Sequence, residues 1–426
     1  MAYLPIVIVL LLYFSSIPIA FALLAGALFY FGFINVGMPT DLILQKFITG
    51  TASFPLLAIP FFIMAGSVMN YSGISSKLMS MAEVLTGHMS GGLAQVNVVL
   101  STLMGGVSGS ANADAAMQSK MLVPEMEKRG YSRAFSAAIT AASSSISPVI
   151  PPGIDLIIYA LIANVSVGKM FAAGYMPGLI MCICLMVTVS IISKKRGYTP
   201  TREKRATMNE ILHQLVDSIW ALVLPLVVIV GLRFGIFTPT EAGAFLVLVT
   251  FLIGFFVYKQ LKLEHIKLIL KDTIYGTGTV VLIIVAASVF GYYMTWERIP
   301  QVISSGLIDV TTNKWLMLGI INVLLLVMGM FIEGGAALIL IAPLVVPVVV
   351  GLGVDPIHFG AIAIVNIMIG GITPPFGSMM FTTCTITKTP VQDFVREGWP
   401  MILALLVALV IITFSPKLIM FLPNLI

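Results

Sequence analysis

The sequence predicts an all-α polytopic membrane protein made of two inverted repeats, each with a re-entrant helical hairpin and a broken helix. Composition, paired polar interruptions and the distribution of basic residues support this prediction. Of the 426 residues, 59% are hydrophobic and only 10% are charged, whereas a soluble domain carries roughly 25% charged residues. Four stretches approach or exceed the ~18–20 apolar residues that span a bilayer: 6–31, 219–237, 242–258 and 279–294.

Two polar interruptions occupy matching places in the two halves of the chain. The first covers residues 105–114 and a proline-rich break at 147–153, and the second covers 329–335 and 372–377. Five residue pairs share one separation in sequence, the internal offset, which indicates a duplication: Pro124/Pro347, Pro151/Pro374, Pro152/Pro375, Phe171/Phe394 and Pro177/Pro400. Interrupted helices at matching points of two membrane halves are typical of the binding site of a secondary transporter.

The basic residues orient the helices. Lysines and arginines gather in residues 128–133, 194–205 and 259–271, which the positive-inside rule places on the cytoplasmic side. The base of the second hairpin, residues 351–356, has neither lysine nor arginine and is expected outside. The two halves are therefore predicted to be inverted, with a cytoplasmic N-terminus and a periplasmic C-terminus. The net charge of +5 reflects these loops and does not indicate binding to nucleic acid.

Several other function classes are disfavoured. The first apolar run lacks a basic leader and is interrupted at residues 15–18, so we expect a retained helix and no cleaved signal peptide. There is no glycine-rich loop ending in Gly-Lys-Ser/Thr and hence no sign of ATP hydrolysis. Scattered histidines and apolar cysteines indicate no transition-metal site, and no nucleophile–base pair suggests an enzyme. Four segments look amphipathic and interfacial: 41–49, 77–88, 166–173 and 261–273.

The polar interruptions carry the candidate binding chemistry. Ser108, Ser110, Asn112 and Asp114 fall where the first hairpin turns, and non-helical backbone at membrane depth needs protein, ion or water partners. Helix N-termini favour an anion, while freed carbonyls and hydroxyls suit a hard cation. Prolines at 148, 151 and 152 prevent the next helix from closing its hydrogen bonds. Residues 373–375 repeat that feature in the other half.

Plainer explanations exist for each feature taken alone. The small residues of 136–147 are also typical of close helix packing, and a Pro-Pro pair can be a simple kink. Asp114 could cap a helix, and Glu333 could pair with a basic residue. The recurrence of both breaks beside an intramembrane carboxylate or amide favours binding, because such groups are costly in lipid and usually functional.

These segments resemble the large membrane subunit of tripartite ATP-independent periplasmic (TRAP) transporters. The resemblance spans nearly the whole chain, and its motifs lie at 54–62, 92–97, 105–111, 147–152, 238–242 and 355–360. It implies a sodium-driven importer of organic acids in a bacterial or archaeal cytoplasmic membrane, with an elevator-type transport domain that moves against a scaffold. It also implies two partners: a small four-helix membrane subunit and a soluble periplasmic substrate-binding protein. Sodium is the coupling ion, and no organic cofactor is expected.

The resemblance also assigns residues. One sodium site is expected around Ser108, Ser110, Ser145, Ser147 and Pro148, and another around Gly329, Gly370 and Thr373. Substrate is expected near Ser108, Asn112, Gly153, Asp155 and Glu333. The chain departs from the family pattern at four positions: Ser147, Gly153, Asp155 and Glu333. Two acids are awkward for an anion carrier, and sodium, substrate hydroxyls or a coupling proton are the competing explanations for them.

The expected domain boundaries follow from these features. Scaffold helices and interfacial segments take residues 1–90 and 216–313, where Phe21, Trp220, Glu241 and Tyr293 lie. The transport domain takes 91–193 and 314–398, separated by a basic cytoplasmic linker at 194–215, and the last helix is 399–426. A stand-alone sodium- or proton-coupled anion symporter or exchanger without a binding protein stays open as an alternative. An intramembrane enzyme and a channel are less favoured.

Overall fold

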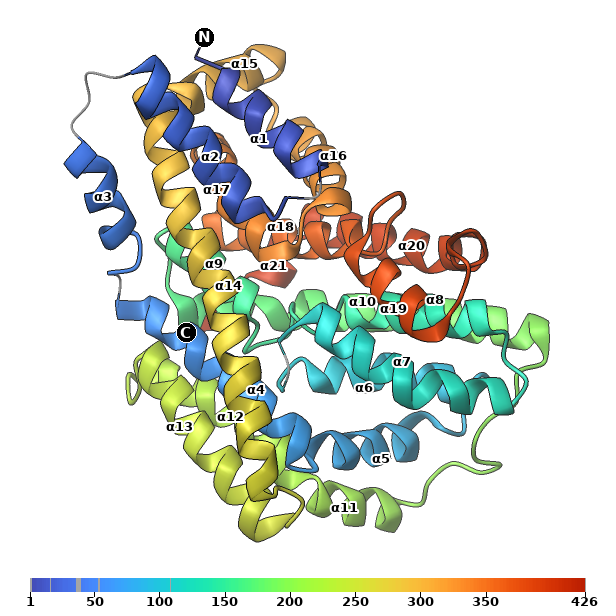
Figure 1. Ribbon diagram of the computed structural model, residues 1–426. Coiled ribbons are helices and arrows are strands. Elements are labelled where there is room, and N and C mark those ends of the chain that lie inside the picture. Colours follow the sequence, from blue (N-terminus) through green and yellow to red (C-terminus); the bar gives the residue numbers. More distant parts are fainter. Residues whose placement is uncertain (1, 16, 36–39, 53, 108, 426) are drawn as a thin grey trace.

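The computed structural model describes residues 2–15, 17–35, 40–52, 54–107 and 109–425, and within them every regular element is helical. This confirms the all-α membrane prediction. Six described helices are long and apolar enough to cross a membrane, or seven spans if a bent pair, Met208–Asp217 with Ile219–Arg233, counts as one. The paired hairpins and broken helices of Figure 1 are built mostly from helices of 10 to 18 residues.

The first half begins with two short helices, α1 (Leu4–Phe14) and α2 (Ile19–Phe29), which pack against each other. The prediction of one span over residues 6–31 is therefore wrong. Pro18 occupies the N-cap of α2, and a proline has no N–H with which to continue the preceding helix. The chain turns back at that point. The apolar stretch predicted at 219–237 is also shorter as a helix, because α12 spans Ile219–Arg233.

The rest of the first half supplies the first hairpin and the first broken helix. The hairpin is formed by α6 and α7, and the break at Pro148–Gly153 separates α8 from α9. The elements are η1 (Tyr30–Ile34), α3 (Thr40–Thr49), η2 (Phe54–Leu57), α4 (Ala58–Tyr71), α5 (Ile74–Thr86), α6 (Gly92–Met104), α7 (Ala111–Lys128), α8 (Arg133–Ser144), α9 (Ile154–Ile162) and α10 (Val167–Arg196).

The second half repeats this order. Its hairpin is formed by α16 and α17, and its break separates α18 from α19. The elements are α11 (Met208–Asp217), α12, α13 (Pro239–Leu252), η3 (Ile253–Val257), α14 (Leu263–Trp296), α15 (Ile299–Val310), α16 (Lys314–Phe331), α17 (Gly334–Gly351), α18 (Pro356–Gly370), α19 (Ser378–Thr387), α20 (Val391–Phe414), α21 (Pro416–Ile419) and η4 (Pro423–Leu425). The bounds of α7 and α17 differ by the internal offset at both ends, as do the starts of α8 and α18.

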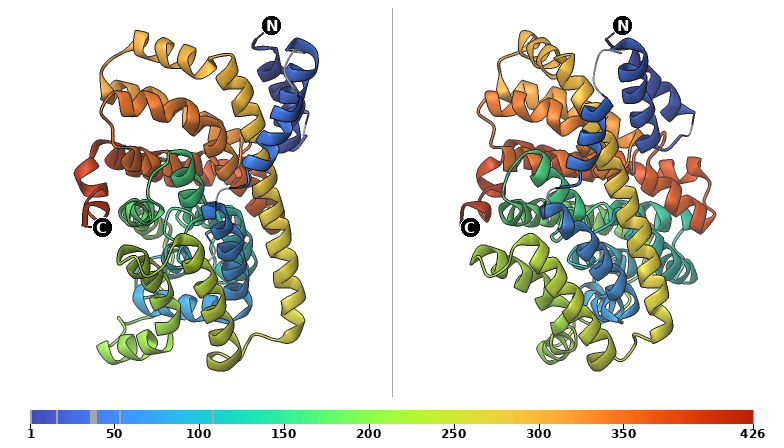
Figure 2. Two further views of the ribbon diagram at one scale, coloured as in Figure 1. Left: turned by 90° about the vertical axis from the view of Figure 1, so that its left-hand side faces the viewer. Right: turned by 60° about the vertical axis from the view of Figure 1, so that its left-hand side comes forward.

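Two of the predicted interfacial segments are not separate surface helices. Residues 41–49 and 77–88 do fall in short helices, α3 and α5. Residues 166–173 instead form the start of the 30-residue α10, where Met170 and Phe171 are fully buried. Residues 261–273 lead into the 34-residue α14. Figures 1 and 2 show α14 running along the outside of the molecule over most of its height.

The basic segments lie on one side of the molecule. Tyr131, at the base of the first hairpin, stacks on Tyr198 of the linker, with ring centroids 4.2 Å apart. Just after the linker, Asp217 accepts a hydrogen bond at its carbonyl from Tyr258 Oη, 3.0 Å away, beside the third basic segment. Hairpin base, linker and the start of α14 are thereby connected.

The two hairpin bases lie at opposite ends of α20. Near its start, Glu397 pairs with Arg196, the last residue of α10, at 2.7 Å. Near its end, the Ile412 carbonyl is 2.9 Å from Nε2 of His358, at the base of the second hairpin.

The N-terminus lies far from the lysine-bearing start of α14. Tyr293, near the end of that helix, donates a hydrogen bond to the Ala2 carbonyl at 2.5 Å. The 34-residue helix α14 therefore separates the N-terminus from the third basic segment. The orientation of the termini stays a prediction.

Candidate functional site

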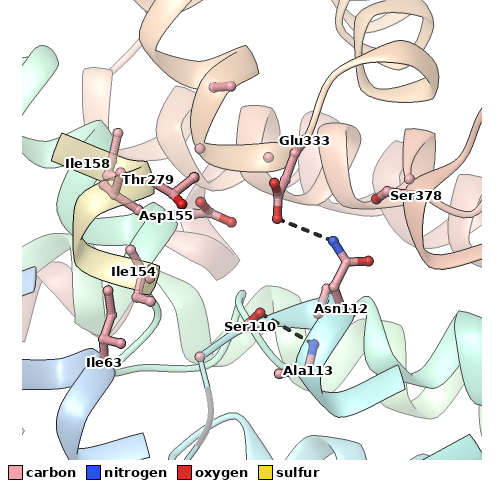
Figure 3. Close-up of a pocket in the computed structure, with 18 of the residues that line it drawn as sticks. Ile63, Ser110, Asn112, Ala113, Ile154, Asp155, Ile158, Thr279, Glu333 and Ser378 are labelled. Atoms are coloured by element: carbon pink, nitrogen blue, oxygen red, sulfur yellow. Dashed lines mark hydrogen bonds between the residues drawn. The ribbon is translucent and has the colours of Figure 1, made fainter. Parts of the chain in front are cut away.

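Four helices begin around one cavity. A cavity of about 470 Å³ is lined by the first residues of α7, α9, α17 and α19, and α4 and α14 form its remaining walls. Figure 3 shows side chains from these elements projecting into it. The hairpin tips of both halves and the far sides of both breaks therefore meet at one place.

The local sequence starts each helix at the cavity. Ser110 is the N-cap of α7, where its Oγ accepts a hydrogen bond from the Ala113 amide at 3.4 Å. Glu333 occupies the N-cap of α17. Gly153 and Gly377 precede α9 and α19, after the two proline-rich breaks. Helix N-termini carry partial positive charge and free N–H groups, so four of them direct both toward one cavity.

Three of the predicted substrate residues come together here. Asn112 Nδ2 donates to Glu333 Oε1 at 3.2 Å, which links the two hairpin tips. Asn112 Oδ1 is buried and has no hydrogen-bond partner among the described residues. Asp155 lies against the first turn of α17, since a Cβ placed on Gly334 would be 2.9 Å from Asp155 Oδ2. Figure 3 shows the carboxylates of Asp155 and Glu333 both directed into the cavity.

The other two predicted substrate residues are not among the described lining. Ser108 lies outside the described residues. Gly153 does not line the cavity but lies beneath the first hairpin tip, where a Cβ on Gly109 would be 3.5 Å from the Gly153 Cα. Gly109 itself has a φ of +57°, a conformation that glycine adopts without the steric cost of a Cβ.

Apart from Ser110, the described residues of the two predicted sodium sites lie behind the cavity. Of the first group, Ser110 lines the cavity, while Ser145, Ser147 and Pro148 lie at the break after α8. The Ser145 hydroxyl donates to the Ala142 carbonyl at 2.6 Å. The Ser147 carbonyl faces the hairpin, 3.0 Å from a Cβ placed on Gly105. Carbonyl oxygens at this break are therefore close to the hairpin backbone.

The second group repeats this arrangement. A Cβ on Gly370 would lie 2.6 Å from the Gly329 Cα, so the backbones of the second hairpin and its broken helix are in direct contact. Thr373 Oγ1 donates to the Ile369 carbonyl at 2.7 Å. The described residues contain no group of three or more His, Cys, Asp or Glu side chains that could hold a metal.

Asp114 stabilises the first hairpin internally. Its side chain is 1% exposed and accepts hydrogen bonds from Ser101 Oγ and Gln118 Nε2, both at 2.8 Å. It therefore joins α6 to α7 and does not line the cavity. Of the plainer alternatives, a structural role is the one that the contacts support.

Sequence reasoning missed several lining residues. Ser378, at the start of α19, is the counterpart of Asp155 under the internal offset, so the duplication could have found it. The α4–α14 wall contains Ser67, which donates to Asp272 Oδ2 at 3.1 Å. The polar positions 272, 275 and 279 recur at helical spacing along α14. That periodicity was a usable signal.

A second cavity of about 820 Å³ lies beyond the first. It is bounded by the α9–α10 connection and the later part of α14, and the two cavities share only Ile158 and Ile339 among their lining residues. Along α14, positions up to Ile283 line the first cavity and positions from Ile284 onward line the second. A thin apolar partition therefore separates them.

Comparison with known proteins gives consistent matches. A family model described as "Tripartite ATP-independent periplasmic transporter, DctM component" matches residues 6–418. The sialic acid TRAP transporter large permease protein SiaM of Vibrio cholerae is 36% identical, covering 97% of this chain and 96% of that protein. The 2,3-diketo-L-gulonate TRAP transporter large permease protein YiaN of Escherichia coli is 35% identical over 95% and 94%. The C4-dicarboxylate TRAP transporter large permease protein DctM of Rhodobacter capsulatus is 32% identical over 96% of each.

Solved structures share the fold at much lower identity. The YdaH transporter of Alcanivorax borkumensis aligns with a TM-score of 0.59, 14% identity and 88% of each chain covered. MtrF of Neisseria gonorrhoeae, described as an antimetabolite efflux pump, aligns with a TM-score of 0.57 and 14% identity, over 88% of this chain and 83% of its own.

Proposed function

Because the chain belongs to the DctM family of tripartite ATP-independent periplasmic transporters, we propose that it forms the translocation path of a sodium-driven importer of organic acids. The family makes the chain a large permease of the inner membrane and a transporter, not an enzyme. The named substrates of its relatives, sialic acid, diketogulonate and C4-dicarboxylates, are all organic acids. The observation that carries the proposal is the convergence of four helix N-termini on one cavity.

The substrate acid binds at this convergence. Backbone N–H groups at helix starts bind an anion without a lysine or arginine. Asn112, Asp155, Glu333, Ser110 and Ser378 contact the substrate, and we expect the same of Ser108. The hydrogen bond between Asn112 and Glu333 joins the tips of both hairpins, so a ligand that displaces or extends this bond contacts both halves at once.

Sodium binds behind each hairpin tip. Ser145, Ser147 and Pro148 offer oxygens in the first half, and Gly329, Gly370 and Thr373 offer them in the second. Oxygen-only ligation suits a hard cation such as sodium. In both halves the break is in backbone contact with its hairpin, so an ion bound there fixes the tip that lines the substrate cavity. Ordering the tip first lowers the entropy cost of substrate binding, which couples the two ligands.

Transport proceeds by an elevator motion. The hairpins and broken helices, α6–α10 and α16–α20, form the moving domain, and α1–α4 with α12–α14 form the scaffold. The cavity lies between them, with the helix starts on one side and α4 and α14 on the other. The first cavity follows α14 toward its lysine-bearing start, which is the cytoplasmic side under the positive-inside rule. Sliding the moving domain along α14 would carry the substrate past the partition to the other cavity.

Two partners complete the transporter. A small four-helix membrane subunit supports the scaffold, and a periplasmic binding protein delivers the acid from outside.

Reconstituted uptake tests the proposal. Proteoliposomes would hold the chain and its small partner, with the binding protein outside and a panel of radiolabelled organic acids, with and without an inward sodium gradient. We expect uptake that needs both sodium and the binding protein. Sodium- or proton-driven uptake without the binding protein would instead establish a stand-alone symporter. Accumulation of no acid under any gradient would contradict the proposal.

A further inference from the structure

The four helix starts around the cavity form two chemically different pairs. α9 packs on α17, and α7 packs on α19. The α9/α17 pair carries acids, Asp155 in the first turn of α9 and Glu333 at the N-cap of α17. The α7/α19 pair carries hydroxyls, Ser110 at the N-cap of α7 and Ser378 as the first residue of α19. Figure 3 shows Asp155 and Ser378 on opposite sides of Glu333.

The difference between the two pairs of helix starts breaks the symmetry of the duplicated halves. Under the internal offset, Glu333 is the counterpart of Ser110, and Ser378 is the counterpart of Asp155. Each half thus contributes one serine and one acid, but at exchanged positions. Both acids are consequently brought to one side of the cavity and both serines to the other.

The electrostatic consequence is a cavity with two unlike sides. On the acidic side, two carboxylates oppose the partial positive charge of their own helix starts. No lysine, arginine or histidine is among the described lining residues. On the serine side, the acid in the first turn of α7 is Asp114, whose bonds to Ser101 and Gln118 turn it into the hairpin, and α19 has no acid in its first turn. Of the two pairs of helix starts, the serine side is therefore the more favourable for an anion.

The acidic side retains free acceptors. Asn112 Nδ2 donates a hydrogen bond to one oxygen of Glu333, and the Asp155 carboxylate accepts no hydrogen bond from the described residues. Asn112 Oδ1, buried and unpartnered in the described structure, adds a third acceptor. Unpaired acceptors call for hydrogen-bond donors on the ligand.

We propose that Asp155 determines specificity: with Glu333 it selects acids that carry hydroxyl or ammonium donors at the end far from their carboxylate, and it excludes a second carboxylate. The substrate carboxylate binds at the serine side, and the donor-bearing end faces Asp155 and Glu333. A dicarboxylate would place its second carboxylate against those of Asp155 and Glu333, which repel it. This inference rests on the proposed function, because it concerns the same cavity.

The test measures ligand binding to the purified membrane subunits in sodium, without the binding protein, which would impose a selectivity of its own. Titration calorimetry would compare four-carbon acids that differ only at the far end: butyrate, 4-hydroxybutyrate, 4-aminobutyrate and succinate. A second matched pair is gluconate and glucarate, which differ by a terminal hydroxymethyl against a carboxylate. We expect the donor-bearing acids to bind at least about tenfold more tightly than their dicarboxylate partners. The comparison of 4-hydroxybutyrate with 4-aminobutyrate shows whether a hydroxyl or an ammonium donor is preferred.

Substitutions at Asp155 complete the test. Asp155→Ser removes one of the two acids and should reduce the gluconate-to-glucarate preference at least about tenfold. Asp155→Asn should have the same effect while keeping the side-chain shape. Asp393→Asn removes an exposed acid on α20 and should leave the preference unchanged. Equal or tighter binding of succinate and glucarate, no binding by any donor-bearing acid, or an unchanged preference in Asp155→Ser would each overturn the inference. None of these results bears on whether sodium drives uptake, so the proposed function is judged separately.

Discussion

Gly329→Ala tests the contact between the second hairpin and its broken helix. A Cβ at this position would lie 2.6 Å from the Ile367 carbonyl oxygen and 2.9 Å from the Ile367 Cα. Both are backbone atoms within α18, so no side-chain rotation can relieve the overlap. Such overpacking costs about 1–3 kcal/mol, while the alanine regains about 0.5–1 kcal/mol of helix propensity. The net expectation is a loss of about 1–2 kcal/mol.

The same substitution should weaken sodium coupling, because the hairpin would be displaced from Gly370 and Thr373. If about 1.4 kcal/mol of the loss affects the ion-bound state, the apparent sodium affinity falls about tenfold. Sodium titration of uptake in proteoliposomes and thermal unfolding of the purified protein measure the two effects. Gly319→Ala is the matched control, since it lies on the same helix and its Cβ would meet nothing within 4 Å. Equal unfolding temperatures and sodium dependence for the two variants would refute the reasoning.

Three further predictions concern interactions away from the ion sites. Tyr159→Phe removes a hydrogen bond of 2.6 Å to a backbone carbonyl at the start of α18 and should destabilise the protein by about 1 kcal/mol. Tyr175→Phe removes a buried hydroxyl with no partner among the described residues and should leave the unfolding temperature unchanged. A larger loss of stability in Tyr175→Phe than in Tyr159→Phe would contradict this. Asp217→Asn breaks the pair with Lys77, both about one-third or more exposed, and should change stability by less than about 1 kcal/mol; a larger loss that is insensitive to salt would refute a surface pair. Ile339→Ala thins the partition between the cavities and should raise substrate-independent sodium-22 efflux from vesicles, whereas an unchanged efflux would show that other side chains seal the path.

Much of the fold could be predicted because the signals are local. The prolines at 124 and 347 are related by the internal offset, and the structure places them at equivalent points of α7 and α17. The prediction of a single span over residues 6–31 failed because hydropathy carries no information on chain direction. Hydropathy measures the solvent around a segment, and it does not distinguish one long helix from two short helices that fold back in the same apolar surroundings. The proline at 18 was the available signal for the turn.

The site was predicted from the sequence on the side formed by the interruptions. The polar interruptions in the sequence point to Asn112, Asp155 and Glu333, and all three line the cavity. Asp272 and its neighbours on α14 come from a helix far away in the sequence, so only tertiary packing places them opposite the hairpins. Asp114 was visible as a costly buried acid, and Gln118, four residues later on the same helix, already indicated a local partner.

The scaffold departs from the duplication at one point, and this departure has a physical cause. Shifted by the internal offset, α3 (Thr40–Thr49) matches the start of α14 and α4 (Ala58–Tyr71) matches its later part. The first half thus has two helices joined by η2 where the second half has one continuous helix of 34 residues. Prolines at 55 and 60 interrupt the first copy, whereas glycine and isoleucine stand at the matching positions 278 and 283. A proline in the connection removes a backbone donor and blocks a continuous helix, while glycine at 278 lowers propensity without breaking the hydrogen bonds. The wall of the cavity opposite the helix starts is therefore formed by α4, the second helix of a jointed pair, and by α14, a single continuous helix. In the proposed elevator motion, α14 is the element along which the moving domain would slide.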